Sequence, residues 1–199
     1  MMSVDDVKFL YGLACFGLCL IIISPSVAMF VSLPGGEPFS ELWVLGEGGM
    51  AEGYPFDVVE NETYRVRLGV GNRMGCSEYY MVYVKFRNRS EPLPDGLSGT
   101  PSVLPPLYEY RFFVREGEVW ERMVAFSFSG VSVDGNVSRV SFITVDGVVV
   151  FVDKTALWDS EGNGYYYQLF FELWLYDLAS RGFRFHGRFV GLWLNVTVS

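Results

Sequence analysis

Few side chains in this sequence are of the types that perform chemistry. The chain of 199 residues has one histidine, His186, and one cysteine beyond residue 33, Cys76. A Ser–His–Asp or Cys–His arrangement would have to be built on that single imidazole, and no G-x-S-x-G sequence marks a nucleophile. A catalytic zinc generally uses more than one histidine. We therefore predict no catalytic residues and no cofactor, and we interpret His186, within "FRFHGRF", as a structural or surface residue of a strand.

The segment "DSEGNG", which begins at Asp159, is the best candidate for an ion site. Asp159, Glu161 and Asn163 occupy alternate positions, and Gly164 stands where a calcium-binding loop has its glycine. The twelfth position of such a loop is Phe170 rather than a bidentate Glu, and no helical pattern flanks the segment. A polar turn is the simpler interpretation, and a weak calcium site is the alternative.

Four N-x-[ST] triplets indicate sites for N-linked glycans. All four lie beyond the apolar N-terminal run, and none has proline in the middle position. A single triplet can arise by chance, but four on one side of an apolar run favour a glycosylated outer domain. The candidate acceptors are Asn61, Asn88, Asn136 and Asn195.

The N-terminal region is predicted to be a membrane anchor. Residues 9–33 carry no charged side chain, and these 25 residues as a helix can cross about 30 Å of hydrocarbon. We predict one transmembrane helix over residues 9–33, in contact with membrane lipid, after a cytoplasmic segment of residues 1–8. The triplet Ser26-Val27-Ala28 leaves signal-peptidase cleavage as the alternative. The first eight residues hold two Asp and one Lys, a poor signal leader, which favours the uncut anchor.

Charge predicts the orientation and excludes one class of partner. Lys8 flanks the N-terminal end of the apolar run, and the next basic residue is Arg65. The positive-inside rule therefore puts the N-terminus in the cytoplasm and residues 34–199 outside the cell, in a single-pass membrane protein. The formal net charge of −8 argues against nucleic acid as a partner, because a binder needs Lys and Arg to neutralise phosphates.

Beyond residue 36, apolar and polar residues alternate, which is typical of half-buried strands. In "TYRVRLGVGN", for example, Tyr64, Val66 and Leu68 share one face. Three pairs of strand-like runs flank short turns, and each pair predicts a β-hairpin. The three turns are residues 115–118, the pair Asp146-Gly147, and residues 178–182.

Seven to nine such strands and no convincing helix predict an all-β domain over residues 34–199. We expect an antiparallel two-sheet sandwich, immunoglobulin-like or jelly-roll-like, preceded by the transmembrane helix. The stretch of residues 88–106 holds five prolines and is predicted to be a long loop of that domain.

Many of the aromatic side chains are expected in the core, because each buries a large apolar area. A sugar-binding face made by stacking on exposed rings is the alternative. The residues concerned are Trp43, Trp120, Trp158, Trp174, Trp193, Tyr165, Tyr166 and Tyr167.

Three stretches resemble an archaeal membrane-protein family known only as domain of unknown function 1616. They are "FSELWVLGEGGMAEGYPFDVVENETYRVRLGVGN", "FELWLYD" and "GRFVGLWLNVTV". The first is similar to that family's E-x-(aromatic/Leu)-x-L-G…A-E-x-Y-P segment, and the last to its closing strand. The resemblance implies an archaeal source and a surface-facing β-domain. It implies no activity and no catalytic residues.

These observations predict a non-enzymatic, single-span cell-surface protein. We expect an accessory or structural subunit of a membrane or cell-envelope assembly, with other membrane or envelope proteins as partners. Two alternatives stay open: a glycan- or peptide-binding surface domain, and a secreted filament or sheath subunit if the N-terminal run is cleaved.

Overall fold

The computed structural model describes residues 4–30 and 37–197, which belong to two units. The first unit, which ends at Pro38, contains the helix α1 (Val4–Phe30), and the second begins at Phe39. Because the two units are independent, each is described by itself. The predicted transmembrane stretch began at residue 9, whereas α1 begins five residues earlier, and residues 31–33 of that stretch lie outside the described residues.

Apolar side chains are exposed along α1 among the residues whose side chains are described, 8–9 and 11–22. Within the described residues, however, no helix is long and apolar enough to cross a membrane. The transmembrane helix therefore stays a prediction, because the described residues do not bear it out. The large exposed apolar residues of α1 are Phe9, Tyr11, Leu13, Phe16, Leu18, Leu20, Ile21 and Ile22.

The second unit consists of strands, which confirms the mostly-β prediction, although the strands number ten rather than seven to nine. All pairings are antiparallel except that of the last strand with the second. The strands are β1 (Phe39–Gly46), β2 (Asp57–Val59), β3 (Tyr64–Arg73), β4 (Glu78–Asn88), β5 (Tyr108–Val114), β6 (Val119–Asp134), β7 (Val137–Val145), β8 (Val148–Asp159), β9 (Gly164–Asp177) and β10 (Gly182–Thr197).

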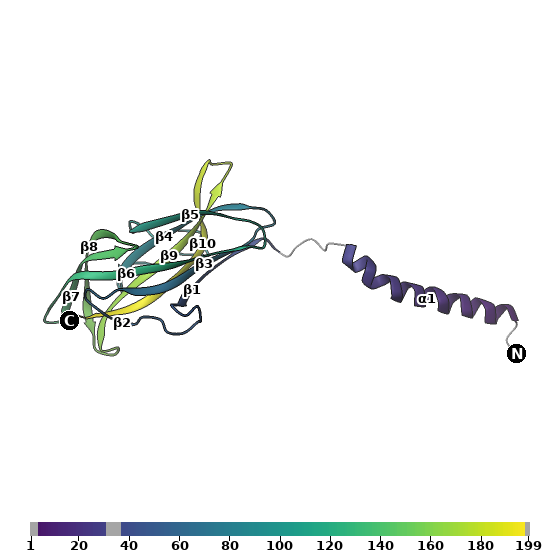
Figure 1. The fold of residues 1–199 in the computed structure, drawn as a ribbon, viewed down its shortest axis with the longest axis horizontal. Helices are drawn as coiled ribbons and strands as arrows, with labels where there is room; N and C mark the ends of the chain where they lie inside the picture. Colours follow the sequence, from purple (N-terminus) through teal and green to yellow (C-terminus); the bar gives the residue numbers. More distant parts are fainter. Residues whose placement is uncertain (1–3, 31–36, 198–199) are drawn as a thin grey trace. The chain divides into compact units, whose positions relative to one another are not determined.

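The strands pair in two runs, drawn in Figure 1. One run has the order β1-β3-β6-β7-β8, and the other has the order β5-β4-β9-β10-β2. Only two residue pairs, Trp158 with Tyr165 and Asp159 with Gly164, connect β8 to β9. Because this connection makes the hydrogen-bonded path continuous, two separate sheets are not confirmed.

Two of the three predicted hairpins are confirmed. Asp146 and Gly147 have φ of 46° and 82°, the left-handed conformations that a two-residue hairpin turn requires, and they join β7 to β8. The turn at residues 178–182 joins β9 to β10, and this hairpin projects beyond its neighbours in Figure 1.

The hairpin predicted around residues 115–118 is wrong. The strand β5 pairs with β4, whereas β6 pairs with β3 and β7, so the chain crosses from one run to the other at this turn. Alternation looks the same in both cases, because it reports which face is apolar and not which strand lies beside it. β5 and β6 contact each other through side chains rather than through backbone pairing: the rings of Phe112 and Trp120 stack with centroids 3.7 Å apart.

The core cluster contains apolar side chains from both runs. On β4, Tyr80, Val82, Val84 and Phe86 share one buried face, which we call the inner face. The ring of Phe86 lies 5.5 Å from that of Phe128 on β6. Contacts of this kind join the two runs through side chains as well as through the short β8–β9 pairing.

The outer face of β4 and β9 carries a buried ion pair under the long connection between β4 and β5. Lys85 Nζ lies 2.8 Å from Glu172 Oε2, and both side chains are almost fully buried. Ser102, in that connection, donates its backbone N–H to Glu172 Oε1 at 2.8 Å and accepts from Lys85 Nζ at 2.7 Å. The buried pair therefore fixes the proline-rich connection to the sheet.

Candidate functional site

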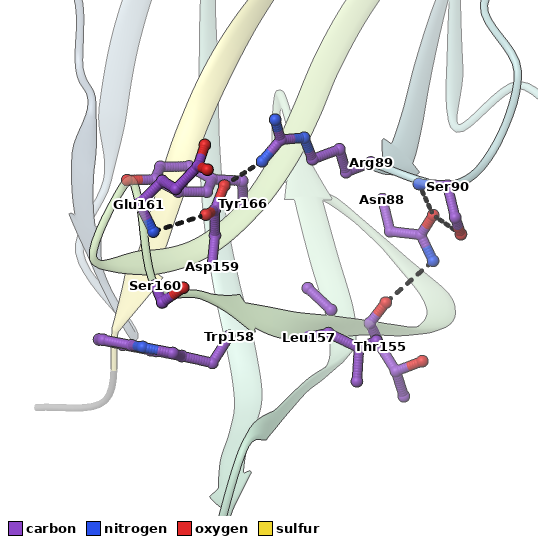
Figure 2. A pocket seen from close by; sticks show the side chains of 11 residues that line it. Asn88, Arg89, Ser90, Thr155, Leu157, Trp158, Asp159, Ser160, Glu161 and Tyr166 are labelled. Carbon is purple, nitrogen blue, oxygen red and sulfur yellow. Dashed lines mark hydrogen bonds and ion pairs between the residues drawn. The ribbon is translucent and has the colours of Figure 1, made fainter.

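A hollow of about 740 Å³ opens where the ends of β4, β8 and β9 meet, and Figure 2 shows its lining. The strand β4 ends there in Asn88, and Arg89 and Ser90 begin the long connection. The last residues of β8 and the following turn form the opposite wall. The lining residues are Asn88, Arg89, Ser90, Thr155, Ala156, Leu157, Trp158, Asp159, Ser160, Glu161 and Tyr166.

Two smaller hollows, of about 330 and 310 Å³, adjoin this one. The first shares Arg89, Asp159 and Tyr166 with the large hollow, and the second shares Phe56 and Trp193 with the first. We call the three hollows together the aromatic groove. Its rings are those of Tyr54, Phe56, Trp158, Tyr166 and Trp193, of which Trp158 and Trp193 are 40% and 38% exposed.

The rings of the groove are held by neighbours, which leaves part of each available to a ligand. Phe56 and Tyr166 have centroids 5.9 Å apart. The guanidinium of Arg87 lies 5.2 Å from the centroid of Trp193, a cation–π arrangement. Trp158 meets Tyr165 edge to face at 5.0 Å. Stacking surfaces beside polar side chains are suited to binding an elongated ligand.

Asp159, the first residue of the calcium candidate, is engaged by its own turn and by Arg89. Its Oδ1 accepts the N–H groups of Glu161 at 3.0 Å and Gly162 at 3.3 Å, and its Oδ2 pairs with Arg89 (Figure 2). The Gly162 N–H bond is the main reason that the pKa of Asp159 is lowered, and the Glu161 N–H and Arg89 act in the same direction. The guanidinium therefore supplies the positive charge at this carboxylate.

The other two members of the candidate, Glu161 and Asn163, are exposed in the same turn, and Asn163 has φ of 56°. Across residues 4–30 and 37–197, no group of three or more His, Cys, Asp or Glu side chains gathers where it could hold a metal ion. The geometry of residues 159–164 is that of a polar turn stabilised by Asp159.

His186 lies in a bulge of β10, between Phe185 and Arg188, where Gly187 has φ of 70°. Burial lowers its pKa, and Arg188 and Arg184 lower it further. Among the described residues that line the hollow around it there is no carboxylate to orient the imidazole. The charged neighbours of this partly buried ring are therefore two guanidinium groups.

Cys76 is exposed before β4, and its Sγ donates to Glu78 Oε1 at 3.1 Å. This hydrogen bond raises the pKa of the thiol. A reactive cysteine needs the opposite shift, because the thiolate is the nucleophile.

The four sequon asparagines occupy different surroundings. Asn61 follows β2 and Asn136 lies in the turn between β6 and β7, and both are exposed. Asn88 lines the large hollow, where its side chain is hydrogen-bonded, and Asn195 lies within β10.

The structure brings together three of the aromatic residues singled out in the sequence, Trp158, Tyr166 and Trp193, while Tyr167 is fully buried. Sequence reasoning missed Phe56 and Arg89 as groove residues. They come from segments far apart along the chain, and no local pattern indicates that the ends of β4, β8 and β9 converge.

Comparison with known proteins identifies a family but no activity. A family model described as "Domain of unknown function (DUF1616)" matches residues 33–148. No curated protein matches the chain. The chain is similar to a CARDB domain from Pyrococcus furiosus, solved in complex with di-metal ions, at 12% identity and a TM-score of 0.37 over 83% of this chain and 94% of that one.

A β-glucosidase from Listeria innocua is also similar. In its complex with gluconolactone the identity is 14% and the TM-score 0.34, over 59% of this chain and 16% of that one. For the mutant enzyme in its complex with laminaribiose, the identity is 8% and the TM-score 0.37, over 80% of this chain and 16% of that one. Similarities this distant carry no argument about ligands or reactions.

Proposed function

Since the chain belongs to the DUF1616 family, for which no function is given, we propose that it is a non-enzymatic, single-span cell-surface protein. In this proposal the N-terminal region holds the protein in a membrane with residues 1–8 in the cytoplasm. The β-domain lies outside the cell as an accessory or structural subunit of a membrane or envelope assembly. We also propose that the two runs of strands face each other as the two sheets of a sandwich.

The apolar surface of α1 is the observation that supports the anchor. Leu13, Leu18 and Ile22 are each at least 60% exposed, and residues 9–33 carry no charge. Leaving such side chains in water costs about 1.5–3 kcal/mol for each, relative to burying them in an apolar environment. A lipid bilayer removes that cost on all sides of a helix at once, whereas a protein surface covers one side.

Fractionation of cells expressing the full chain tests the anchor. The parent protein should stay in the membrane pellet after alkaline carbonate washing. A variant with both Leu13→Arg and Leu20→Arg should move to the supernatant, because each charge at the centre of a span costs about 2.5–3.5 kcal/mol. Leu97→Arg, at a fully exposed position of the long connection, is the matched control and should stay in the pellet.

A parent protein found free in the supernatant, or one whose N-terminus is Met29, would overturn the anchor. The second result would favour a secreted filament or sheath subunit instead. Purification of the native protein after cross-linking would then show whether fixed membrane partners or further copies of the chain accompany it.

The aromatic groove favours a second candidate function, a glycan- or peptide-binding surface. Trp158→Ala together with Trp193→Ala should reduce binding to a captured glycan or peptide by tenfold or more, since hot spots of this kind cost at least about 2 kcal/mol each. Phe113→Ala, an exposed ring outside the groove, is the control. Equal binding by both variants would exclude the groove.

A further inference from the structure

We infer that Asn61 and Asn136 carry N-linked glycans, and that Asn88 and Asn195 are structural residues that stay bare although each lies in a sequon. The inference rests on the proposed outer location of the β-domain. All four asparagines fit the N-x-[ST] pattern. The inference separates them by the hydrogen bonds that their side-chain amides make in the folded protein.

The chemistry sets the requirement. A glycosyl diphosphate donor transfers its sugar to the Asn amide: the bond from Nδ2 to the sugar C1 forms, and the bond from C1 to the phosphate oxygen breaks. The amide gives up one proton, and the diphosphate leaves with the electron pair. Nδ2 must therefore reach the donor, and the attached sugar must have space beside it in the folded domain, whether it is added before or after folding.

Asn195 does not meet this requirement. Its Nδ2 donates to Asp57 Oδ1 at 2.9 Å, and its Oδ1 accepts the backbone N–H of Tyr165 at 2.9 Å. The side chain thus joins β10 to β2 and β9. It also fills the space beside Gly164, where an added Cβ would come within 2.4 Å of Asn195 Oδ1. A sugar on Nδ2 would crowd the contacts that hold β10 to β2 and β9.

Asn88 is held by more hydrogen bonds, some of which Figure 2 shows. Its Nδ2 donates to the carbonyl of Thr155 at 2.9 Å, which ties the end of β4 to β8. Its Oδ1 accepts from the backbone and hydroxyl of Ser90 at 3.0 and 2.8 Å and from the N–H of Glu91 at 3.0 Å. The amide of this sequon is therefore a turn-stabilising group.

Asn61 and Asn136 are held by their backbones, while their side chains make no hydrogen bond to any described residue. The N–H of Asn61 donates to the carbonyl of Phe128 at 2.8 Å, and the carbonyl of Asn136 accepts from the N–H of Trp158 at 2.8 Å. Asn61 has φ of 65°, a conformation that Asn tolerates in tight turns. Both amides are free to react.

The hydroxyl residues of these two sequons predict when each reacts. Thr63 is exposed, so the whole triplet at Asn61 is accessible in the folded domain. Ser138 is fully buried, with its Oγ 3.4 Å from the Tyr167 hydroxyl. Asn136 should therefore accept its glycan only before β7 is packed, whereas Asn61 can react before or after folding.

Mass spectrometry of the full chain from its native host tests the inference. Peptides containing Asn61 and Asn136 should carry glycan mass, and those with Asn88 and Asn195 should not. Asn61→Gln and Asn136→Gln should each remove one glycan, whereas Asn88→Gln and Asn195→Gln should leave the glycan mass unchanged and lower the melting temperature. A glycan on Asn88 or Asn195, or a bare Asn61, would overturn the inference.

A second measurement separates this inference from the proposed location. If all four sites are bare in protein that still resists carbonate extraction, the assignment of glycans fails while the anchor stands. If the protein is absent from the membrane fraction, the anchor fails. With folded, unmodified protein, a glycosyltransferase and a glycosyl diphosphate, Asn61 should be modified and Asn136 should not; modification of both would overturn the predicted order.

Discussion

The outer face of β4 and β9 has one covered half and one bare half. Toward the end of β4, Lys85 and Arg87 are buried, as are Gln168 and Glu172 on β9. The connection between β4 and β5 binds this half through Ser102 and Glu91. Toward the start of β4, an aromatic cluster lies on the same face without that cover. Its members are Tyr79, Phe113, Tyr176 and Phe183.

The two halves show two ways in which side chains on one face of a sheet can be stabilised. Buried charges need partners in fixed positions, so the covered half depends on the connection. Rings can shield one another: Tyr79 and Phe113 stack at 4.2 Å, and Phe113 is still 75% exposed. The covered half should therefore be sensitive to substitution, and the bare half should tolerate it.

The largest effect is expected from Glu172→Ala in the covered half. It leaves Lys85 as an unpaired buried charge and removes the acceptor of the Ser102 N–H, so the free energy of unfolding should fall by about 3–5 kcal/mol. Urea denaturation followed by fluorescence measures the change. The double variant Lys85→Met, Glu172→Leu should lose less than the single one. A loss below about 1 kcal/mol for Glu172→Ala would contradict the importance of the pair.

Tyr79 and Tyr80 are adjacent on β4 and lie on opposite faces, so they allow the outer face to be compared with the inner face. Burial raises the pKa of Tyr80 to about 12. The folded state therefore holds its proton above pH 10, where the unfolded state loses it, so stability falls as pH rises from about 10 to 12. The expected loss is about 2–3 kcal/mol at pH 12.

The Tyr80→Phe variant should lose this part of the alkaline dependence, as measured by unfolding at several pH values. It should also be less stable at pH 7 by about 1–2 kcal/mol, since Ser40 and Asn72 lose a partner. Tyr79→Phe, which removes a hydroxyl from the opposite face of the same strand, is the control for the loss of a phenol hydroxyl. A Tyr80→Phe protein whose stability falls with pH as steeply as that of the parent would argue against the burial effect.

A smaller effect is expected from Phe113→Ser in the bare half. The ring is mostly exposed, so unfolding should become easier by less than about 1 kcal/mol, the typical value of one aromatic pair. A loss similar to that of Glu172→Ala would mean that the two halves do not differ.

The smallest effect concerns Cys76, beside the bare half. Glu78→Gln removes the carboxylate that raises the pKa of the thiol, so alkylation at pH 7.5 should become faster. The rate with a maleimide, measured by mass spectrometry, checks this. An unchanged rate would show that exposure alone controls this thiol.

The sequence indicates strands well because alternation is a local property. It predicts the buried residues Val82 and Val84 and the turn at Asp146-Gly147. It cannot predict that β5 and β6 belong to different runs, because a turn can lead equally well to a neighbouring strand or to the other run. The Lys85–Glu172 pair is likewise hidden, since an isolated Lys in a strand usually indicates a solvent-facing position.

The candidate site was harder to predict than the fold. Aromatic richness indicated a possible binding face, but the same residue types fill the core, as Tyr167 does. The four sequons fit the same sequence pattern, and only the hydrogen bonds of the folded protein distinguish Asn61 from Asn195. One such partner, Asp57, lies 138 residues before Asn195 in the chain.

The parallel pairing of β2 with β10 makes the order of synthesis matter. Among the described strands β2 pairs only with β10, and Asp57 lies 138 residues before Asn195. At about 5–20 residues per second, a ribosome takes roughly 7–28 s to make that interval. During this time one of the first strands produced has no partner. A chain cut before Asn195 would leave β2 without this partner, so the pairing of β10 with β2 comes late in the assembly of the domain.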